Sequence, residues 1–95
     1  MKFKLEPAGV GKHKYVGVFT DGDNKETRIP FGARGFDDYT THKNILRQKL
    51  YLLRHAPRED WKNPMTAGAL SRWILWNTPN LQTNIRLFKQ IFNLQ

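Results

Sequence analysis

Cysteine is absent from this 95-residue chain, and that absence removes several classes of site at once. Without a thiol there is no disulfide framework, no thiolate zinc site and no cysteine nucleophile. Long apolar runs are also absent, because no segment approaches the roughly 18 consecutive apolar residues of a membrane span. The first residues, Met1 to Pro7, lack the apolar stretch of a signal peptide. We therefore expect an intracellular protein without a membrane span.

Acidic residues are scarce in the second part of the chain. Residues 1–38 carry seven basic and six acidic residues, whereas residues 39–95 carry nine basic and only two acidic residues. The formal net charge of the whole chain is +8. A clustered positive excess indicates a polyanionic partner, most often a nucleic acid, or an acidic protein or membrane surface.

The N-terminal third has the patterns of β-structure. Residues 15–20 are rich in β-branched and aromatic side chains, and residues 21–24 form a concentrated turn signal. Thr27, Ile29 and Phe31 then alternate with polar residues, which is the period of a half-buried strand. These patterns predict a β-hairpin whose second strand, because it contains Pro30, lies at a sheet edge or ends there. The pattern of residues 1–12 is also compatible with a third, short edge strand followed by a loop.

The first of three predicted helices covers about residues 42–55. Its apolar residues recur at helical spacing, and they are Leu46, Leu50 and Leu53, flanked by Ile45 and Leu52. Thr40 or Thr41 is the expected N-terminal cap, with acidic residues close to the positive end of the helix. Pro57 ends the helix, and Ala56, as the residue before proline, is expected outside the helical region.

The second predicted helix covers residues 63–77 and is apolar on nearly every side, as a buried helix is. Asn63 is its expected cap, with Thr66 as a competing cap. The third helix is expected to start at Thr78, with Pro79 in its first turn. Its apolar stripe consists of Leu81, Ile85, Phe88 and Phe92. Together these elements predict a single α+β domain over residues 1–95, with a β-rich part over 1–31 and a helical part over 40–95.

A row of basic residues on the first helix is the main candidate for a binding surface. Its members recur at i, i+4, i+8 and i+11, and they are Lys43, Arg47, Tyr51 and Arg54, with Arg58 extending the row. No acidic residue occurs between Tyr39 and Arg58. Such a row follows phosphates, with arginine binding bidentately and tyrosine available to stack on a base. An acidic protein surface also has the right charge, and a solvated face without a partner is the ordinary alternative.

Three tryptophans, Trp61, Trp73 and Trp76, are candidates either for the core or for contact with a partner. The spacing of Trp73 and Trp76 is that of one helix face, so the pair is suited to a stacking platform or a docking anchor. Their apolar neighbours favour a place in the core instead.

The sequence contains no catalytic or metal-binding motif. The three histidines are far apart and lack His-x3-His spacing, so we expect no metal site and no cofactor. Asp38 and His42 stand four residues apart, as a general base and its orienting group do, but a carboxylate at a helix N-terminus more simply caps the helix. Asp21, Asp23 and Asn24 have the chemistry of a turn. We therefore expect a protein that is not an enzyme.

Several segments resemble a family of small uncharacterised basic proteins of large nucleocytoplasmic DNA viruses, such as the chlorella viruses and relatives of mimivirus. The segments that carry the resemblance cover residues 31–35, 38–43, 51–55, 58–61 and 64–77, with the tryptophan-rich last block as the most specific. The resemblance implies a virus-encoded intracellular protein, but no activity and no binding residues. The chain departs from the family pattern at Asn44–Leu46 and at Leu53, where it is more apolar than the family.

The more apolar first helix favours packing against a protein. We therefore expect a virion structural component, a minor capsid or cementing protein whose basic surface binds other virion or capsid proteins. Its location is then the virion, and the host cell interior during infection. The alternative is a sequence-tolerant nucleic-acid-binding protein that contacts phosphates.

Overall fold

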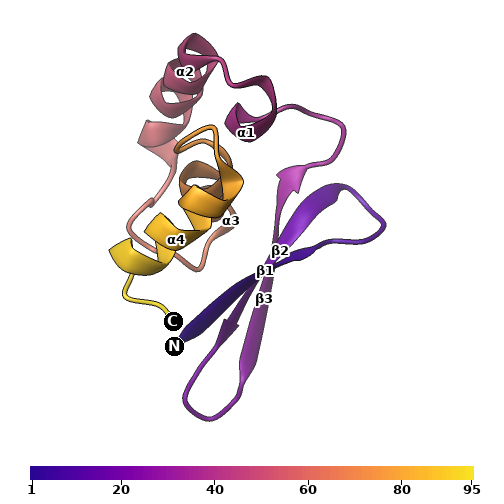
Figure 1. The fold of residues 1–95 in the computed structure, drawn as a ribbon, viewed down its shortest axis with the longest axis vertical. Coiled ribbons are helices and arrows are strands. Elements are labelled where there is room, and N and C mark those ends of the chain that lie inside the picture. The colour runs from indigo at the N-terminus through magenta and orange to yellow at the C-terminus, as the bar shows by residue number, and fades with distance from the viewer.

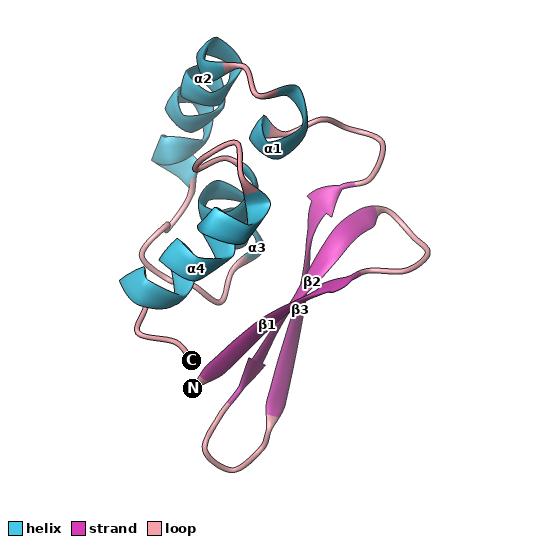
Figure 2. Ribbon diagram, viewed as in Figure 1, coloured by secondary structure: helices cyan, strands magenta, loops and turns pink.

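A computed structural model describes all residues from 1 to 95 and has the predicted α+β architecture (Figures 1 and 2). The three strands are β1 (Lys2–Pro7), β2 (His13–Thr20) and β3 (Glu26–Ala33). The four α-helices are α1 (Tyr39–His42), α2 (Ile45–His55), α3 (Ala67–Leu70) and α4 (Leu81–Ile91). A 3-10 turn, η1 (Ala56–Arg58), follows α2, and a π-helical segment, η2 (Ser71–Leu75), continues α3. The third strand is thus present, and there are four helices where three were predicted.

The strands form one antiparallel sheet in the order β1-β2-β3, so β3 is an edge strand as Pro30 predicted. Pro30 lies opposite Val16, and the strand continues beyond it to Ala33. At the other edge, the two ends of the chain lie side by side (Figure 1). The Phe3 amide donates to the Gln95 carbonyl at 2.8 Å, and the Gln95 amide donates to the Met1 carbonyl at 3.0 Å. These bonds tie the C-terminal residue to β1.

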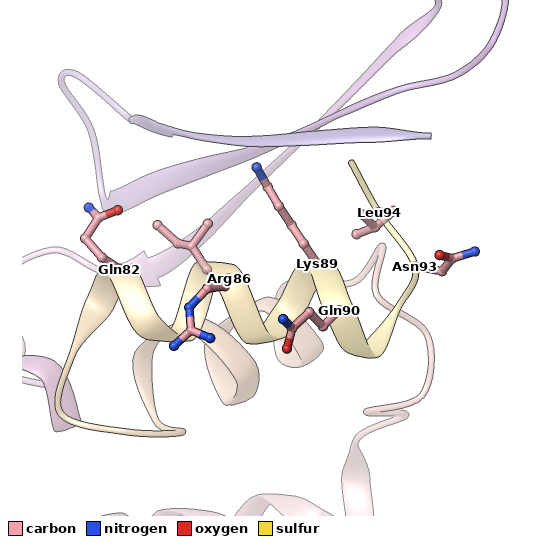
Figure 3. A pocket seen from close by; sticks show the side chains of 7 residues that line it. Gln82, Arg86, Lys89, Gln90, Asn93 and Leu94 are labelled. Carbon is pink, nitrogen blue, oxygen red and sulfur yellow. The ribbon is translucent and has the colours of Figure 1, made fainter.

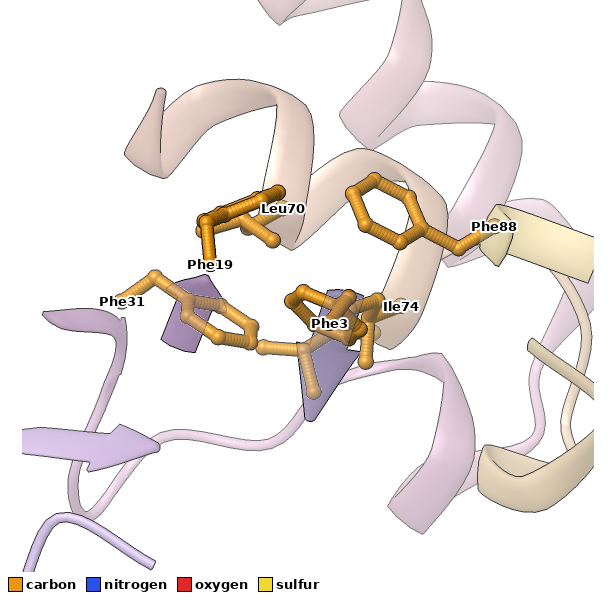
Figure 4. Packing of buried hydrophobic residues seen from close by; sticks show 7 residues of the cluster. Phe3, Phe19, Phe31, Leu70, Ile74 and Phe88 are labelled. Atoms are coloured by element: carbon orange, nitrogen blue, oxygen red, sulfur yellow. The ribbon is translucent and has the colours of Figure 1, made fainter. Parts of the chain in front are cut away.

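One face of the sheet supplies the aromatic part of the core. Residues of one parity point to the same face of a strand, and the register pairs Phe3 with Phe19 and Tyr15 with Phe31. Leu70, Ile74 and Phe88 from the helical part lie against the rings of Phe3, Phe19 and Phe31 (Figure 4). The buried cluster consists of Phe3, Phe19, Phe31, Leu70, Ile74, Leu75 and Phe88. It joins the β-rich part to the stretch from Thr66 to Phe92.

The central strand has a glycine where Leu70 of α3 lies against it. A Cβ atom on Gly17 would lie 3.0 Å from Leu70 Cδ1 and 3.2 Å from Phe3 Cε1. The missing side chain therefore lets Leu70 pack directly on the backbone of β2. This contact places the end of α3 over the middle of the central strand.

The other face of the sheet is covered by charged side chains. Val18 is fully buried there although its neighbours across the sheet are Lys4 and Arg28. Glu6 bridges these two cations, with Lys4 Nζ at 3.1 Å and Arg28 Nη2 at 2.7 Å. The Arg28 bond, followed by the Lys4 bond, lowers the pKa of Glu6. The long side chains of Lys4 and Arg28 thus shield Val18 and form ion pairs with Glu6.

The helix predicted over residues 42–55 is α2, which begins three residues later than predicted, and a separate short helix, α1, precedes it. Lys43 has φ +56°, which is left-handed and ends α1, and Asn44 is extended and starts α2. The predicted caps, Thr40 and Thr41, are wrong, because Asp38 caps α1 and the Asn44 side chain accepts from the Arg47 amide to cap α2. The prediction for Ala56 is also wrong, because this residue has helical φ −50° and ψ −44° and leads into η1.

The two later helices begin further along the chain than predicted. Thr66, the competing cap, accepts from the Ala69 amide at 3.1 Å, so the helix begins at Ala67 rather than at Asn63. Asn80 caps α4, whereas Thr78 donates its amide and hydroxyl to the buried side chain of Asn84. The predicted α4 stripe is confirmed, since Phe88 is buried and its three companions pack on the core cluster.

Candidate binding surface

Helix α2 is attached to the rest of the protein by polar and aromatic side chains. Gln48 Nε2 donates to the Trp76 carbonyl oxygen at 3.1 Å. The Tyr51 ring lies parallel to the Trp76 ring, with centroids 4.1 Å apart and an interplanar angle of 1°. His55 covers the other face of Tyr51 at 4.1 Å. Burial raises the pKa of Tyr51 to about 12, so the phenol stays neutral where it packs on Trp76.

The apolar stripe of α2 points away from the protein. A stripe of this spacing ordinarily faces the core. Here the side chains of Leu46, Leu50 and Leu53 are 62%, 44% and 73% exposed, and Ile45 is 54% exposed. We call these four residues the leucine ridge. The ridge lies outward because the opposite side of α2, with Gln48 and Tyr51, packs against Trp76.

The structure keeps only part of the predicted basic row on one helix face. Arg47, Tyr51 and Arg54 line the same side of α2, whereas Lys43 lies at the left-handed turn before the helix and Arg58 in η1 after it. Tyr51 is not available to stack on a base, because Trp76 and His55 occupy both faces of its ring. That interpretation of Tyr51 is wrong, and its role is to orient α2.

Arg47 and Arg54 face a cleft between α2 and the end of the sheet. The cleft has a volume of about 750 Å³, and its floor includes Leu75 and Trp76. Five basic residues line it, namely Lys12, Lys14, Arg34, Arg47 and Arg54, together with the acidic Asp37 and Asp38. None of the four ion pairs of the structure includes Lys12, Arg47 or Arg54. We call this feature the basic cleft, and its free cations suit an anionic ligand.

The sequence did not indicate that Lys12, Lys14 and Arg34 belong to the same site as α2. They lie on the β1–β2 connection, on β2 and just after β3, and no spacing relates them to Arg47. Two of them also have structural partners. Lys14 Nζ lies 2.7 Å from Asp38 Oδ2, and Arg34 donates to the carbonyls of Gly9 and His13. Only the tertiary structure brings these cations together.

The three tryptophans contact the protein itself. Trp73 lies edge-on to Phe92 at 6.0 Å, and its indole donates to the Trp61 carbonyl at 2.9 Å. The Arg72 guanidinium lies between Trp73 and Trp61, with its carbon 4.2 Å and 5.4 Å from the two ring centroids. Burial lowers the pKa of Arg72, which has no carboxylate partner. Trp73 and Trp76 thus pack against the core cluster, the place that their apolar neighbours favoured, whereas Trp61 packs on Arg72.

Asp38 and His42 serve the helix termini rather than each other. Asp38 accepts from the Thr40 amide at 2.9 Å and pairs with Lys14, so the capping interpretation is confirmed. His42 Nδ1 accepts from the Asn44 amide at 2.9 Å, which stabilises the break between α1 and α2. Its Nε2 is buried without a hydrogen-bond partner. Burial is the largest cause of a lowered pKa at His42, followed by the charge of Arg47.

This lowered pKa predicts that acid weakens the fold. Between the folded pKa of His42 and the ordinary histidine value near 6.5, the unfolded chain binds more protons than the folded chain. The stabilisation is therefore complete above about pH 6.5 and is lost as the pH falls below it. We expect the free energy of unfolding, measured by urea titration, to decrease from pH 7 to pH 5.5.

The His42→Gln variant should show a flatter pH dependence over that interval. His13→Gln is the matched control, because it removes a histidine from the sheet and leaves the α1–α2 break intact. Glu6 contributes only at more acid pH, since its pKa is lowered from 4.5. An unchanged pH profile for His42→Gln would contradict this assignment.

A second hollow lies along the exposed side of α4 (Figure 3). The labelled side chains are spaced along the helix and do not converge on one point. The hollow is lined by amide, apolar and two basic side chains and contains no carboxylate. Elsewhere, no three histidine or acidic side chains come together. None of the helices has the length and apolar character needed to cross a bilayer.

The fold and this surface define a small, basic α+β domain with a cleft and an exposed apolar helix face. The chain belongs to the DUF5754 family, a family of unknown function, whose sequence model matches residues 3–55. The matched region ends with α2, so it contains the sheet, the leucine ridge and the basic residues of the cleft, but not the tryptophan-rich block. Comparison with curated proteins and with solved structures finds no match.

Proposed function

We propose that this protein is a non-enzymatic structural component of a virus particle, a minor capsid or cementing protein that binds other virion proteins. The viral setting comes from the sequence resemblance and is part of the proposal. The observation that carries the protein-binding role is the leucine ridge. Three leucines on one face of one helix are each more than two-fifths exposed. Contiguous apolar surface of this kind is typical of a protein-binding site.

The basic residues around the ridge fit the same role. Charged groups beside an apolar patch select partners of opposite charge and raise the association rate. Arg47, Lys49 and Arg54 are exposed on α2 and form no ion pair within the chain. A virion protein with an acidic and apolar surface can pair with these charges and cover the leucines at the same time.

The composition of purified particles tests the virion assignment. If the protein is a structural component, mass spectrometry of density-purified virions will detect it in fixed proportion to the major capsid protein. Washing the particles with high salt should release part of it, because part of the binding energy is electrostatic. A protein that is abundant in infected cells but absent from the particles would sink this proposal.

The basic cleft favours a second candidate function, sequence-tolerant nucleic-acid binding. Its cations come from α2 and from the sheet and its connections, and four of them lack an acidic partner. Each phosphate neutralised on single-stranded DNA contributes about −0.7 to the slope of log K against log salt. Contact by Lys12, Arg34, Arg47 and Arg54 therefore predicts a slope of roughly −3.

Fluorescence anisotropy with a labelled single-stranded oligonucleotide measures this slope. Arg47→Glu with Arg54→Glu should flatten it by about half and weaken binding at low salt. The control, Arg86→Glu with Lys89→Glu, makes the same charge change on α4 and should have a smaller effect. No binding at low salt, or equal effects of the two double variants, would exclude the cleft as a nucleic-acid site.

A further inference from the structure

The outward direction of the leucine ridge is set by specific contacts. α2 packs against Trp76 through the hydrogen bond of Gln48 and the stacked ring of Tyr51. At the start of the helix, the Asn44 side-chain oxygen accepts a hydrogen bond from the Arg47 amide at 3.1 Å. The helix therefore has a defined end and a defined inner side. The ridge is a fixed surface about three turns long, since α2 has 11 residues at 1.5 Å each.

Cations border the three leucines of the ridge on both sides. At 100° per residue, Arg47 and Arg54 lie between the leucines and the basic cleft, and Lys49 lies on the other side of the leucines, between Leu53 and Ile45. From Tyr39 to Arg58 the chain has no acidic residue. The surface is thus apolar along its centre and positive along its edges.

A second copy of the chain does not complement this surface. Two α2 helices packed on each other bring together edges that are positive on both sides, and like charges at close range are destabilising. The acidic groups that are free of ion pairs are Asp21, Asp23, Glu26, Asp37 and Asp60. None of them belongs to a segment with an exposed apolar row, since Asp37 has only the single exposed ring of Phe36 beside it in the chain.

We propose that the leucine ridge docks an acidic amphipathic helix of another protein. The complementary segment has apolar residues at i, i+3 or i+4, and i+7, bordered by Asp or Glu, over about three turns. Its apolar face covers Leu46, Leu50 and Leu53, and its carboxylates face Arg47, Lys49 and Arg54. This inference rests on the proposed protein-binding function and specifies the chemistry of the partner.

A designed peptide tests the proposal without knowledge of the partner. The probe is a 15-residue helical peptide with leucines on one face and glutamates beside them, labelled for fluorescence anisotropy. A second peptide has lysine in place of each glutamate, and a third has the glutamate peptide's composition in scrambled order. We expect the glutamate peptide to bind at least tenfold more tightly than either control. Amide chemical-shift changes should centre on α2.

Variants of the protein locate the site. Leu50→Glu with Leu53→Glu should weaken binding of the glutamate peptide at least tenfold. Ile91→Glu, on the exposed side of α4, should leave the binding unchanged. Circular dichroism confirms that each variant is folded. Lys49→Glu with Arg54→Glu keeps the leucines and should reverse the preference towards the lysine peptide.

Three results would overturn the inference. They are equal binding of the glutamate and lysine peptides, unchanged binding by Leu50→Glu with Leu53→Glu, and a dimer in sedimentation that this double variant dissociates. The last result would assign the ridge to a second copy. Peptide binding and particle composition are separate measurements. Failure of the peptide test with the protein present in virions rejects only this inference, and the reverse outcome rejects only the virion assignment.

Discussion

Replacing Phe88 with alanine should lower the free energy of unfolding by about 3–5 kcal/mol, the usual cost of removing a buried phenylalanine ring. Phe88 is fully buried, and its ring centroid lies 4.8 Å from that of Phe3 and 5.1 Å from that of Phe92. It is therefore the side chain through which α4 packs on β1. A domain is stable by only about 5–15 kcal/mol, so the variant should lose a large share of its stability.

Urea unfolding followed by tryptophan fluorescence measures this loss. Ile91→Ala is the matched control, because Ile91 is on the same helix and is half exposed. Its free energy of unfolding should stay within about 0.5 kcal/mol of the parent protein. A loss below about 1 kcal/mol for Phe88→Ala would mean that α4 does not pack as described.

Replacing Asn84 with alanine should cost about 2–4 kcal/mol, because it leaves several buried polar groups without partners. Asn84 is fully buried. Its Nδ2 donates to the carbonyls of Ile74 at 2.8 Å and Thr78 at 2.9 Å, and its Oδ1 accepts from the Thr78 amide at 3.0 Å. One side chain thus joins the end of η2 to the first turns of α4.

The Asn84→Asp variant distinguishes the bonds that Asn84 accepts from the bonds that it donates. The aspartate keeps the Oδ1 acceptor but has a second oxygen in place of the amide nitrogen, so the donor to Ile74 and Thr78 is lost, and at neutral pH a buried charge lies beside two carbonyls. It should therefore be more destabilising than Asn84→Ala at pH 7, and should recover part of the loss in acid. The control is Gln82→Ala on the exposed side of α4. Equal stability of Asn84→Ala and Gln82→Ala in urea titration would contradict the network.

The strands and α4 were predictable because their signals are local. Alternation at Thr27, Ile29 and Phe31 indicates which face of β3 is apolar, and that face is the one on the core. The α4 stripe works in the same way, since Phe88 and its neighbours at helical spacing all pack inward. In both cases the residues that are close in sequence determine the buried face.

The helix starts were less predictable because several capping residues compete. Thr78 and Asn80 are both good caps. Asn80 caps the helix because the amide and hydroxyl of Thr78 donate to the buried side chain of Asn84 instead. Lys43 gave no signal that it would adopt a left-handed conformation and end α1. Local preferences of about 1 kcal/mol cannot separate such alternatives.

The sequence by itself determined the α+β class, the periodicity of each amphipathic element and the concentration of positive charge after residue 38. Only the tertiary structure decided which face of α2 is buried. Trp76, which lies 28 residues after Gln48, binds that side chain and stacks on Tyr51, so the polar side turns inward and the leucines remain outside. The basic cleft likewise exists only when β2, β3 and α2 come together, because side chains far apart in the chain acquire a common position through non-local contacts.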